Sequence, residues 1–173
     1  QSVANGDPYR SVTLSRDYIV YELIRGRQVV MSSAVIELYP LYQAYRHARG
    51  NVLLGGLGLG VLARLLCEKP EVTSVTAVEL HGDIISLCGF RHEKMRILQA
   101  DFYAYVHTEP LERYEYVFFD TFSEGDDLYR SVIIPMKRFF LETYPAIRCD
   151  FWNEDHLKME YFASPGSAIH SAH

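Results

Sequence analysis

The sequence has few cysteines, no long apolar segment and no excess of basic residues. Cys67, Cys88 and Cys149 are odd in number, widely spaced and without a CxxC pair, so neither a disulfide framework nor a zinc site is expected. No uninterrupted apolar run approaches the ~20 residues that cross a bilayer. The beginning of the chain also lacks the cationic and apolar stretches of a secretory signal. We therefore expect reduced thiols in a cytoplasmic protein that has no membrane partner.

The charge balance argues against one further class of partner. The net charge is -5 over 173 residues, whereas proteins that bind the phosphate backbone of nucleic acids carry clustered Lys and Arg. We therefore expect no general nucleic-acid binding. Hydrophobic residues make up 49% of the chain and charged residues 23%, which is typical of a globular chain with a substantial core.

Short apolar segments alternate with helical patterns along most of the chain. Strands are expected at 12–23, 28–32, 52–54, 74–80, 95–99, 116–119 and 147–152, and helices at 34–47, 61–67, 83–88 and 128–144. The first two strands predict a hairpin at 1–33. The alternation that follows predicts an α/β domain at 34–163: a Rossmann-like, mostly parallel sheet with helices on both faces. Residues 164–173 are expected to form a flexible tail.

A glycine-rich segment follows the first strand of this predicted domain. Gly56, Gly58 and Gly60 stand between the strand and a helix-compatible run, where glycine permits a tight turn and lets a ligand approach backbone N–H groups. Glu79 ends the next strand, about 20 residues later, where nucleotide-binding units place the carboxylate that accepts from ribose hydroxyls. A close-packed turn and a solvated glutamate are the alternatives without a ligand.

Two further carboxylates end later strands. Asp101 is followed by Phe102, so the carboxylate can accept from an adenine amino group while the ring covers the base. A helix cap is the alternative role for Asp101. Asp120 follows four apolar strand residues, which would carry it into the central crevice, where burial raises a carboxyl pKa. We therefore expect Asp120 to act as a base or as an anchor for a cation.

These motifs occur in the order found in one enzyme superfamily. The glycine loop with Glu79, residues 99–102 and residues 114–120 resemble successive motifs of class I S-adenosylmethionine-dependent methyltransferases, and the resemblance covers roughly residues 34–152. It implies S-adenosyl-L-methionine as the cofactor, bound by Gly56, Gly58, Gly60, Glu79, Asp101, Phe102 and Asp120. A dinucleotide site would share the glycine loop and Glu79, but it would not predict the two later motifs.

Two finer resemblances imply different transfers. The hairpin followed by residues 55–60 resembles polyamine synthases such as spermidine synthase, which transfer aminopropyl groups but usually have an acidic residue where this loop has Gly58 and Leu59. Residues 119–124 resemble the Asp-Thr-aromatic motif of guanidino N-methyltransferases. Residues 31–42 resemble the segment that carries a guanidinium-binding glutamate in those families, here Glu37. This resemblance implies that Glu37 and Asp120 are catalytic: they orient a basic nitrogen, and Asp120 accepts its proton.

We therefore predict a methyltransferase that modifies an amine or guanidine group of a small molecule or peptide. The sulfonium methyl group is already activated, so transfer needs alignment and exclusion of water rather than a metal. Aminopropyl transfer, cleavage of S-adenosylmethionine and non-catalytic binding are the alternatives, and Glu37 as a solvated helix residue is the simpler role for that side chain. Tyr103, Tyr105, Phe122 and Trp152 are candidate aromatic walls around a cation, although packing is the ordinary role of any one of them.

The C-terminal part of the sheet is expected to be short. Little chain remains after 147–152 for the two strands that usually complete this fold, and residues 159–162 are a candidate for rebuilding the edge. A short sheet and an exposed hairpin leave unpaired strand edges, which oligomerisation covers. We therefore expect a homo-oligomer, most simply a dimer.

Overall fold

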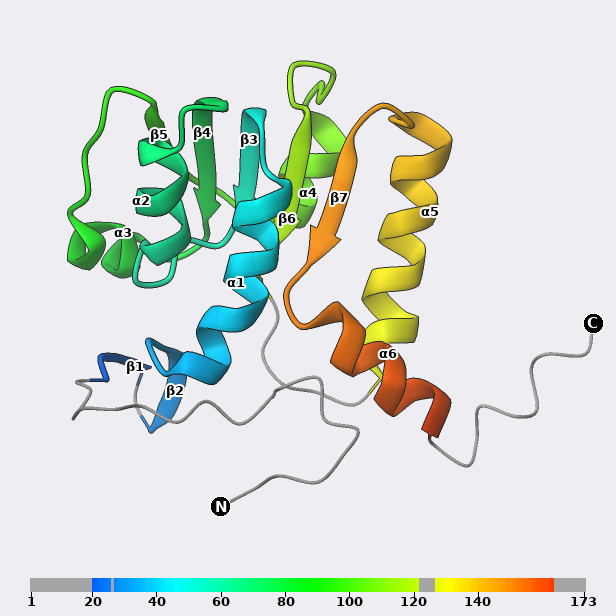
Figure 1. Cartoon of the computed structure of the whole chain (residues 1–173), viewed down its shortest axis with the longest axis horizontal. Helices are drawn as coiled ribbons and strands as arrows, with labels where there is room; N and C mark the ends of the chain where they lie inside the picture. Colours follow the sequence, from blue (N-terminus) through cyan, green and yellow to red (C-terminus); the bar gives the residue numbers. More distant parts are fainter. Residues whose placement is uncertain (1–19, 26, 122–126, 164–173) are drawn as a thin grey trace, which may run out of the picture.

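A parallel sheet between two layers of helices forms the centre of the molecule (Figure 1). The computed structural model describes residues 20–25, 27–121 and 127–163. Its strands are β1 (Glu22–Arg25), β2 (Gln28–Ser32), β3 (Gly50–Gly55), β4 (Val72–Glu79), β5 (Met95–Gln99), β6 (Tyr116–Phe119) and β7 (Arg148–Phe151). Its helices are α1 (Val35–His47), α2 (Val61–Glu68), α3 (Gly82–Cys88), α4 (Phe102–Thr108), the π-helical turn η1 (Tyr129–Ile133), α5 (Ile134–Thr143) and α6 (Glu154–Ala163).

The order of the strands in the sheet reverses at one point. The order is β5-β4-β3-β6-β7, and every neighbouring pair is parallel. The chain moves outward from β3 in one direction and then returns to its other side with β6. In parallel α/β sheets, ligands bind outside the carboxyl ends of the strands where the order reverses in this way. That point lies between the ends of β3 and β6, where Gly55 pairs with Phe119.

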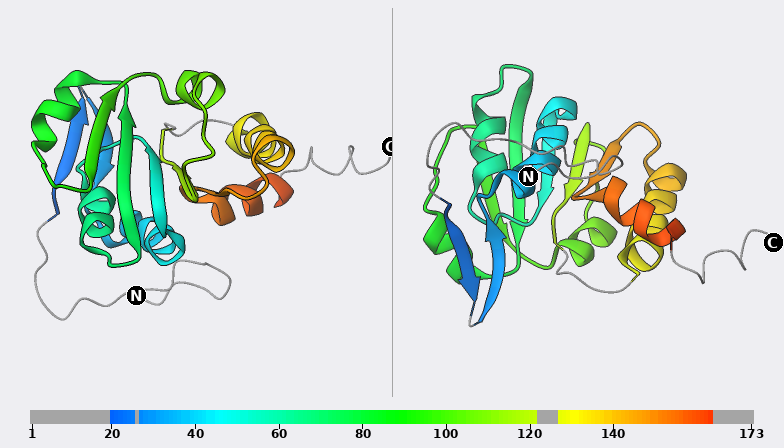
Figure 2. Two further views of the ribbon diagram at one scale, coloured as in Figure 1. Left: turned by 90° about the horizontal axis from the view of Figure 1, so that it is seen from above. Right: turned by 60° about the horizontal axis from the view of Figure 1, so that its bottom comes forward.

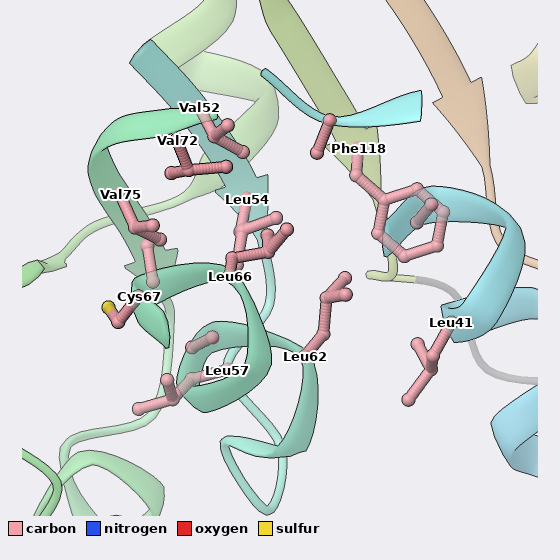
Figure 3. Packing of buried hydrophobic residues seen from close by; sticks show 14 of the residues in the cluster. Leu41, Val52, Leu54, Leu57, Leu62, Leu66, Cys67, Val72, Val75 and Phe118 are labelled. Atoms are coloured by element: carbon pink, nitrogen blue, oxygen red, sulfur yellow. The ribbon is translucent and has the colours of Figure 1, made fainter. Parts of the chain in front are cut away.

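Alternate residues of the central strands enter two separate cores, one on each face of the sheet. Val52 and Leu54 of β3 pack with residues of α1, α2 and α3 (Figure 3). Leu53, between them, packs on the opposite face with residues of α4 and α5. Because both faces are covered, the two central strands carry apolar runs, at 52–54 in β3 and along all of β6. The sequence predicts most strands to within two residues, and the predicted fold class is confirmed.

Two predicted elements are wrong in part. Residues 159–162 lie in α6 rather than in an edge strand. Glu154 and Asp155 in its first turn complement the helix dipole, so four residues of apolar pattern did not decide the structure there. The predicted helix at 128–144 begins as a π-helical turn, in which the N–H of Ile134 bonds to the carbonyl oxygen of Tyr129. Within the described residues the sheet ends at β7, as the predicted shortening requires.

The hairpin lies at the carboxyl end of the sheet (Figures 1 and 2). β1 and β2 pair antiparallel, with Glu22 opposite Ser32, as predicted. Most of the expected first strand, 12–23, and the whole expected tail, 164–173, lie outside the described residues. In the described part of the chain, no helix combines the length and apolar character needed to span a membrane.

Helix α1 is fixed at its C-terminal end by polar contacts. Lys69 is buried, and its Nζ donates to the carbonyl oxygens of Tyr45 at 2.6 Å and Ala48 at 2.8 Å. Asp150 of β7 pairs with His47 at 2.8 Å. The last carbonyls of a helix lack partners within it, so these contacts hold that end of α1 in place. The first turn at the other end carries Glu37.

Candidate functional site

The loop between β3 and α2 turns on three glycines with positive φ. The angle is +88° at Gly56, +50° at Gly58 and +72° at Gly60, a region that L side chains rarely adopt. A Cβ on Gly56 would clash with the backbone oxygen of Asp120, and one on Gly60 would clash with Sγ of Cys88. These glycines are therefore required by the turn itself and by the close approach of two other segments.

Glu79 holds this loop from the end of β4. Its side chain is buried, and the residue is only 6% exposed. Oε2 accepts from the N–H of Leu57 at 2.9 Å, and Oε1 accepts from the N–H of His81 at 2.9 Å. A carboxylate oxygen can accept more than one hydrogen bond. Glu79 therefore fixes the loop and still has acceptor capacity at the position predicted to bind ribose.

Asp120 lies at the point where the strand order reverses. It directly follows β6, and its backbone N–H donates to the carbonyl oxygen of Gly55 at 2.9 Å. Burial raises the pKa of its carboxyl group to about 7, and the negative charges of Glu37 and Glu79 act in the same direction. Three elements, α1, β4 and β6, thus bring three carboxylates within electrostatic range of one another. A positively charged ligand would relieve their repulsion.

Glu37, Glu79 and Asp120 can act on a ligand through their charge and their acceptor oxygens. Across residues 20–25, 27–121 and 127–163, no group of three or more His, Cys, Asp or Glu side chains is arranged to hold a metal ion. As carboxylates, Glu37, Glu79 and Asp120 accept hydrogen bonds and attract cations, and the raised pKa of Asp120 lets it exchange a proton near neutral pH.

Asp101 and Phe102 have structural roles. Oδ1 of Asp101 accepts from the N–H of Ala104 at 2.9 Å and caps α4, which is the alternative role that its position allows. The ring of Phe102 packs edge-on against Phe119 with 4.9 Å between centroids, and a Cβ on Gly55 would clash with it. The adenine contacts of both residues stay predictions, and we leave Phe102 out of the proposed site because its ring is buried in the core.

Two of the four candidate aromatic walls lie near the end of β6. Thr121 directly follows Asp120. Its hydroxyl donates to the hydroxyl oxygen of Tyr103 at 3.1 Å. Burial raises the pKa of Tyr103. Trp152 continues the pairing of β7 with β6 through its backbone N–H. Tyr105 is buried in the core, and Phe122 lies outside the described residues.

The hairpin contributes a side chain to the loop that sequence reasoning misses. Sδ of Met31 lies 3.1 Å from the backbone nitrogen of Leu59, and a Cβ on Gly58 would clash with the same sulfur. No local pattern marks this contact, because it joins a hairpin strand to a loop far along the chain. Only the position of the hairpin beside the loop in three dimensions reveals the contact of Met31.

Comparison with known proteins identifies the fold. No protein-family model and no curated protein matches the sequence, but solved structures do. A spermidine synthase in complex with the transition-state analogue AdoDATO matches with a TM-score of 0.50 and 16% identity, over 78% of this chain and 51% of that one. The fold is that of class I S-adenosylmethionine-dependent methyltransferases.

Other solved structures match over less of the chain. Spermidine synthase from Thermotoga maritima has a TM-score of 0.49 and 18% identity, over 69% of this chain and 44% of that one. A chain from a complex that contains the Haloferax volcanii Trm112 methyltransferase activator has a TM-score of 0.40 and 13% identity, over 49% of this chain and 39% of that one. This chain thus spans about half the length or less of the solved chains it matches.

Proposed function

We propose that the protein is an S-adenosylmethionine-dependent methyltransferase acting on an amine or guanidine nitrogen of a small molecule or peptide. The observation that carries the proposal is the carboxylate cluster of Glu37, Glu79 and Asp120 beside the glycine loop. A sulfonium cofactor and a basic nitrogen both bring positive charge to this cluster. Each would therefore lower the electrostatic repulsion among the three side chains.

The residues present fit the cofactor. The glycines at 56, 58 and 60 give the loop the tight turn that brings its backbone to the end of β3, and Glu79 would accept from the ribose hydroxyls. Asp101 is positioned at the end of β5, although its Oδ1 already caps α4. When bound, the cofactor supplies a methyl group activated by a positively charged sulfur.

Asp120 and Glu37 would act on the nitrogen that receives the methyl group. A general base works best when its pKa lies near the working pH, and the pKa of Asp120 is raised to about 7. Asp120 would accept the proton that the nitrogen loses. Glu37, from the first turn of α1, would accept hydrogen bonds from the remaining N–H groups and orient the lone pair.

Binding tests the cofactor assignment. In calorimetric titrations with S-adenosylmethionine and S-adenosylhomocysteine, Glu79→Ala is expected to lower affinity by about tenfold or more, because it removes hydrogen bonds to a charged group. Glu68→Ala is the matched control, since Glu68 is exposed at the end of α2. Glu79→Gln, which keeps the shape of the side chain, serves where the alanine variant unfolds. Unchanged affinity in a folded Glu79 variant would overturn the assignment.

The masses of the products test the reaction. The protein is incubated with either S-adenosylmethionine or its decarboxylated form and a panel of amines, guanidines and peptides. We expect a gain of one methyl group with S-adenosylmethionine, and loss of that activity in Asp120→Asn. A gain of one aminopropyl group from the decarboxylated cofactor would instead identify a polyamine-synthase type of transferase. Tight binding without turnover would identify a binding protein.

A further inference from the structure

Met31 of β2 lies directly on the glycine loop. Its Sδ accepts from the N–H of Leu59 at an N-to-S distance of 3.1 Å. The same sulfur fills the space in which a side chain at position 58 would lie, so Gly58 is needed for the contact. Met31 thus accepts a hydrogen bond from a backbone N–H of the loop and also fills the space beside Gly58.

Among the described residues, Glu79 and Met31 accept hydrogen bonds from backbone N–H groups of the loop, and Met31 is the weaker acceptor. The N–H of Leu57 donates to the carboxylate of Glu79 at 2.9 Å, and a charged acceptor strengthens such a bond. A thioether sulfur is only a weak acceptor, whereas a backbone N–H is a strong donor. The N–H of Leu59 is therefore the one that a carboxylate on a ligand can take over. The unbranched side chain of Met31 has the freedom to move aside.

We propose that Met31 is a specificity-determining residue, which competes with the carboxylate of a ligand's amino-acid tail for the N–H of Leu59. The inference rests on the proposed function, which brings S-adenosylmethionine to this loop. A ligand with the tail replaces a weak sulfur acceptor by a charged one and displaces Met31. An adenosyl ligand without the tail leaves Met31 in place. Through Met31, the hairpin changes only the contribution that the amino-acid tail makes to the affinity of the ligand.

The test compares two ligands that share the adenosyl group. S-adenosylhomocysteine has the amino-acid tail, and 5′-methylthioadenosine does not. Their affinities for the wild type and for Met31→Ala are measured by calorimetry. Removal of the competing sulfur is expected to raise the affinity for S-adenosylhomocysteine by about threefold to tenfold, the equivalent of one modest hydrogen bond. The affinity for 5′-methylthioadenosine is expected to change by less than about twofold.

Leu23→Ala is the matched control. Leu23 lies opposite Met31 in the hairpin and is buried, so this variant weakens the packing of the hairpin and keeps the sulfur. We expect Leu23→Ala to change the affinity for both ligands by the same factor. Equal gains for both ligands in Met31→Ala, or selective gain for the tailed ligand in Leu23→Ala, would show that a loosened hairpin sets the affinity. Either result would overturn the role of Met31.

A second measurement uses the wild-type protein. The Cε methyl group of Met31, one of four methionines, is observed by NMR after carbon-13 labelling and assigned with Met31→Leu. Its resonance is expected to shift with S-adenosylhomocysteine and to stay in place with 5′-methylthioadenosine. A resonance that S-adenosylhomocysteine leaves unmoved, while both ligands bind, overturns the inference alone. Failure of both ligands to bind overturns the proposed function, and the inference with it.

Discussion

Asp120 lowers the stability of the folded protein at and above neutral pH. Its pKa is raised from an ordinary value of 3.8 to about 7, so between these values the folded state holds a proton that the unfolded state has lost. The free energy of unfolding therefore falls as the pH rises through this range, and the full cost is present above it. A carboxylate placed to bind a cation lowers the free energy of unfolding as long as no cation is bound.

The substitution Asp120→Asn tests this effect. It is expected to raise the free energy of unfolding at about pH 8 by on the order of 2 kcal/mol, and to change it little below about pH 4. Urea denaturation across this pH range measures the difference. Glu112→Gln, at an exposed position between α4 and β6, is the control for the loss of one surface carboxylate. A variant at position 120 that is less stable than the wild type at about pH 8 would contradict the electrostatic argument.

At the scale of single residues, the sequence predicts the carboxylates better than the aromatic contacts. Glu79 ends β4, Asp120 directly follows β6 and Glu37 lies in the first turn of α1, so strand and helix patterns suffice to bring them toward one end of the sheet. Phe102 instead packs according to the space left above Gly55, which is set by the three-dimensional placement of β3. The contact of Met31 with the loop depends on placement in the same way.

Helix α1 relies on Lys69 for the end that faces away from Glu37. Replacement by methionine keeps most of the apolar length of the side chain but removes the donor to the carbonyl oxygens of Tyr45 and Ala48. We expect Lys69→Met to lower the free energy of unfolding by about 2 kcal/mol, because buried acceptors lose their partner. Urea denaturation at neutral pH measures the loss.

Lys158→Met is the control for Lys69→Met. Lys158 is exposed on α6, where most substitutions change stability by less than about 0.5 kcal/mol. If the variant at position 69 were as stable as this control, water would have to satisfy both carbonyl oxygens, and the cap would have no part in fixing α1.

Sequence patterns miss helices α4 and α6 and the π-helical turn η1. Helix α4 begins at the cap that Asp101 provides, so a cap rather than an apolar period marks its start. The π-helical turn depends on one hydrogen bond, between Ile134 and Tyr129, and apolar spacing does not register it. The central strands β3 and β6 are predicted most directly, because burial on both faces of the sheet gives each of them an apolar run.

The whole molecule leaves both edges of its sheet open within the described residues. There β5 pairs only with β4, and β7 pairs only with β6. Tyr21 and Ile24 of the hairpin region are also exposed, at 66% and 57%. Open edges and exposed apolar groups favour association with a second copy. We propose a homodimer, which sedimentation velocity at micromolar concentration is expected to show; a single monomeric species there would contradict it.

Because the strand order reverses, residues of the site that are neighbours in space are synthesised at different times. Strands β3, β4 and β5, with Glu37 and Glu79, lie in the part of the chain that leaves the ribosome first, and β6 with Asp120 follows. Pairing of β6 with β3 joins segments far apart in the chain, and such contacts form late. The glycine loop is therefore synthesised before Asp120, the carboxylate that follows β6. A ligand that needs all three carboxylates binds only chains whose second half has docked, and it favours the completed protein over its half-made precursors.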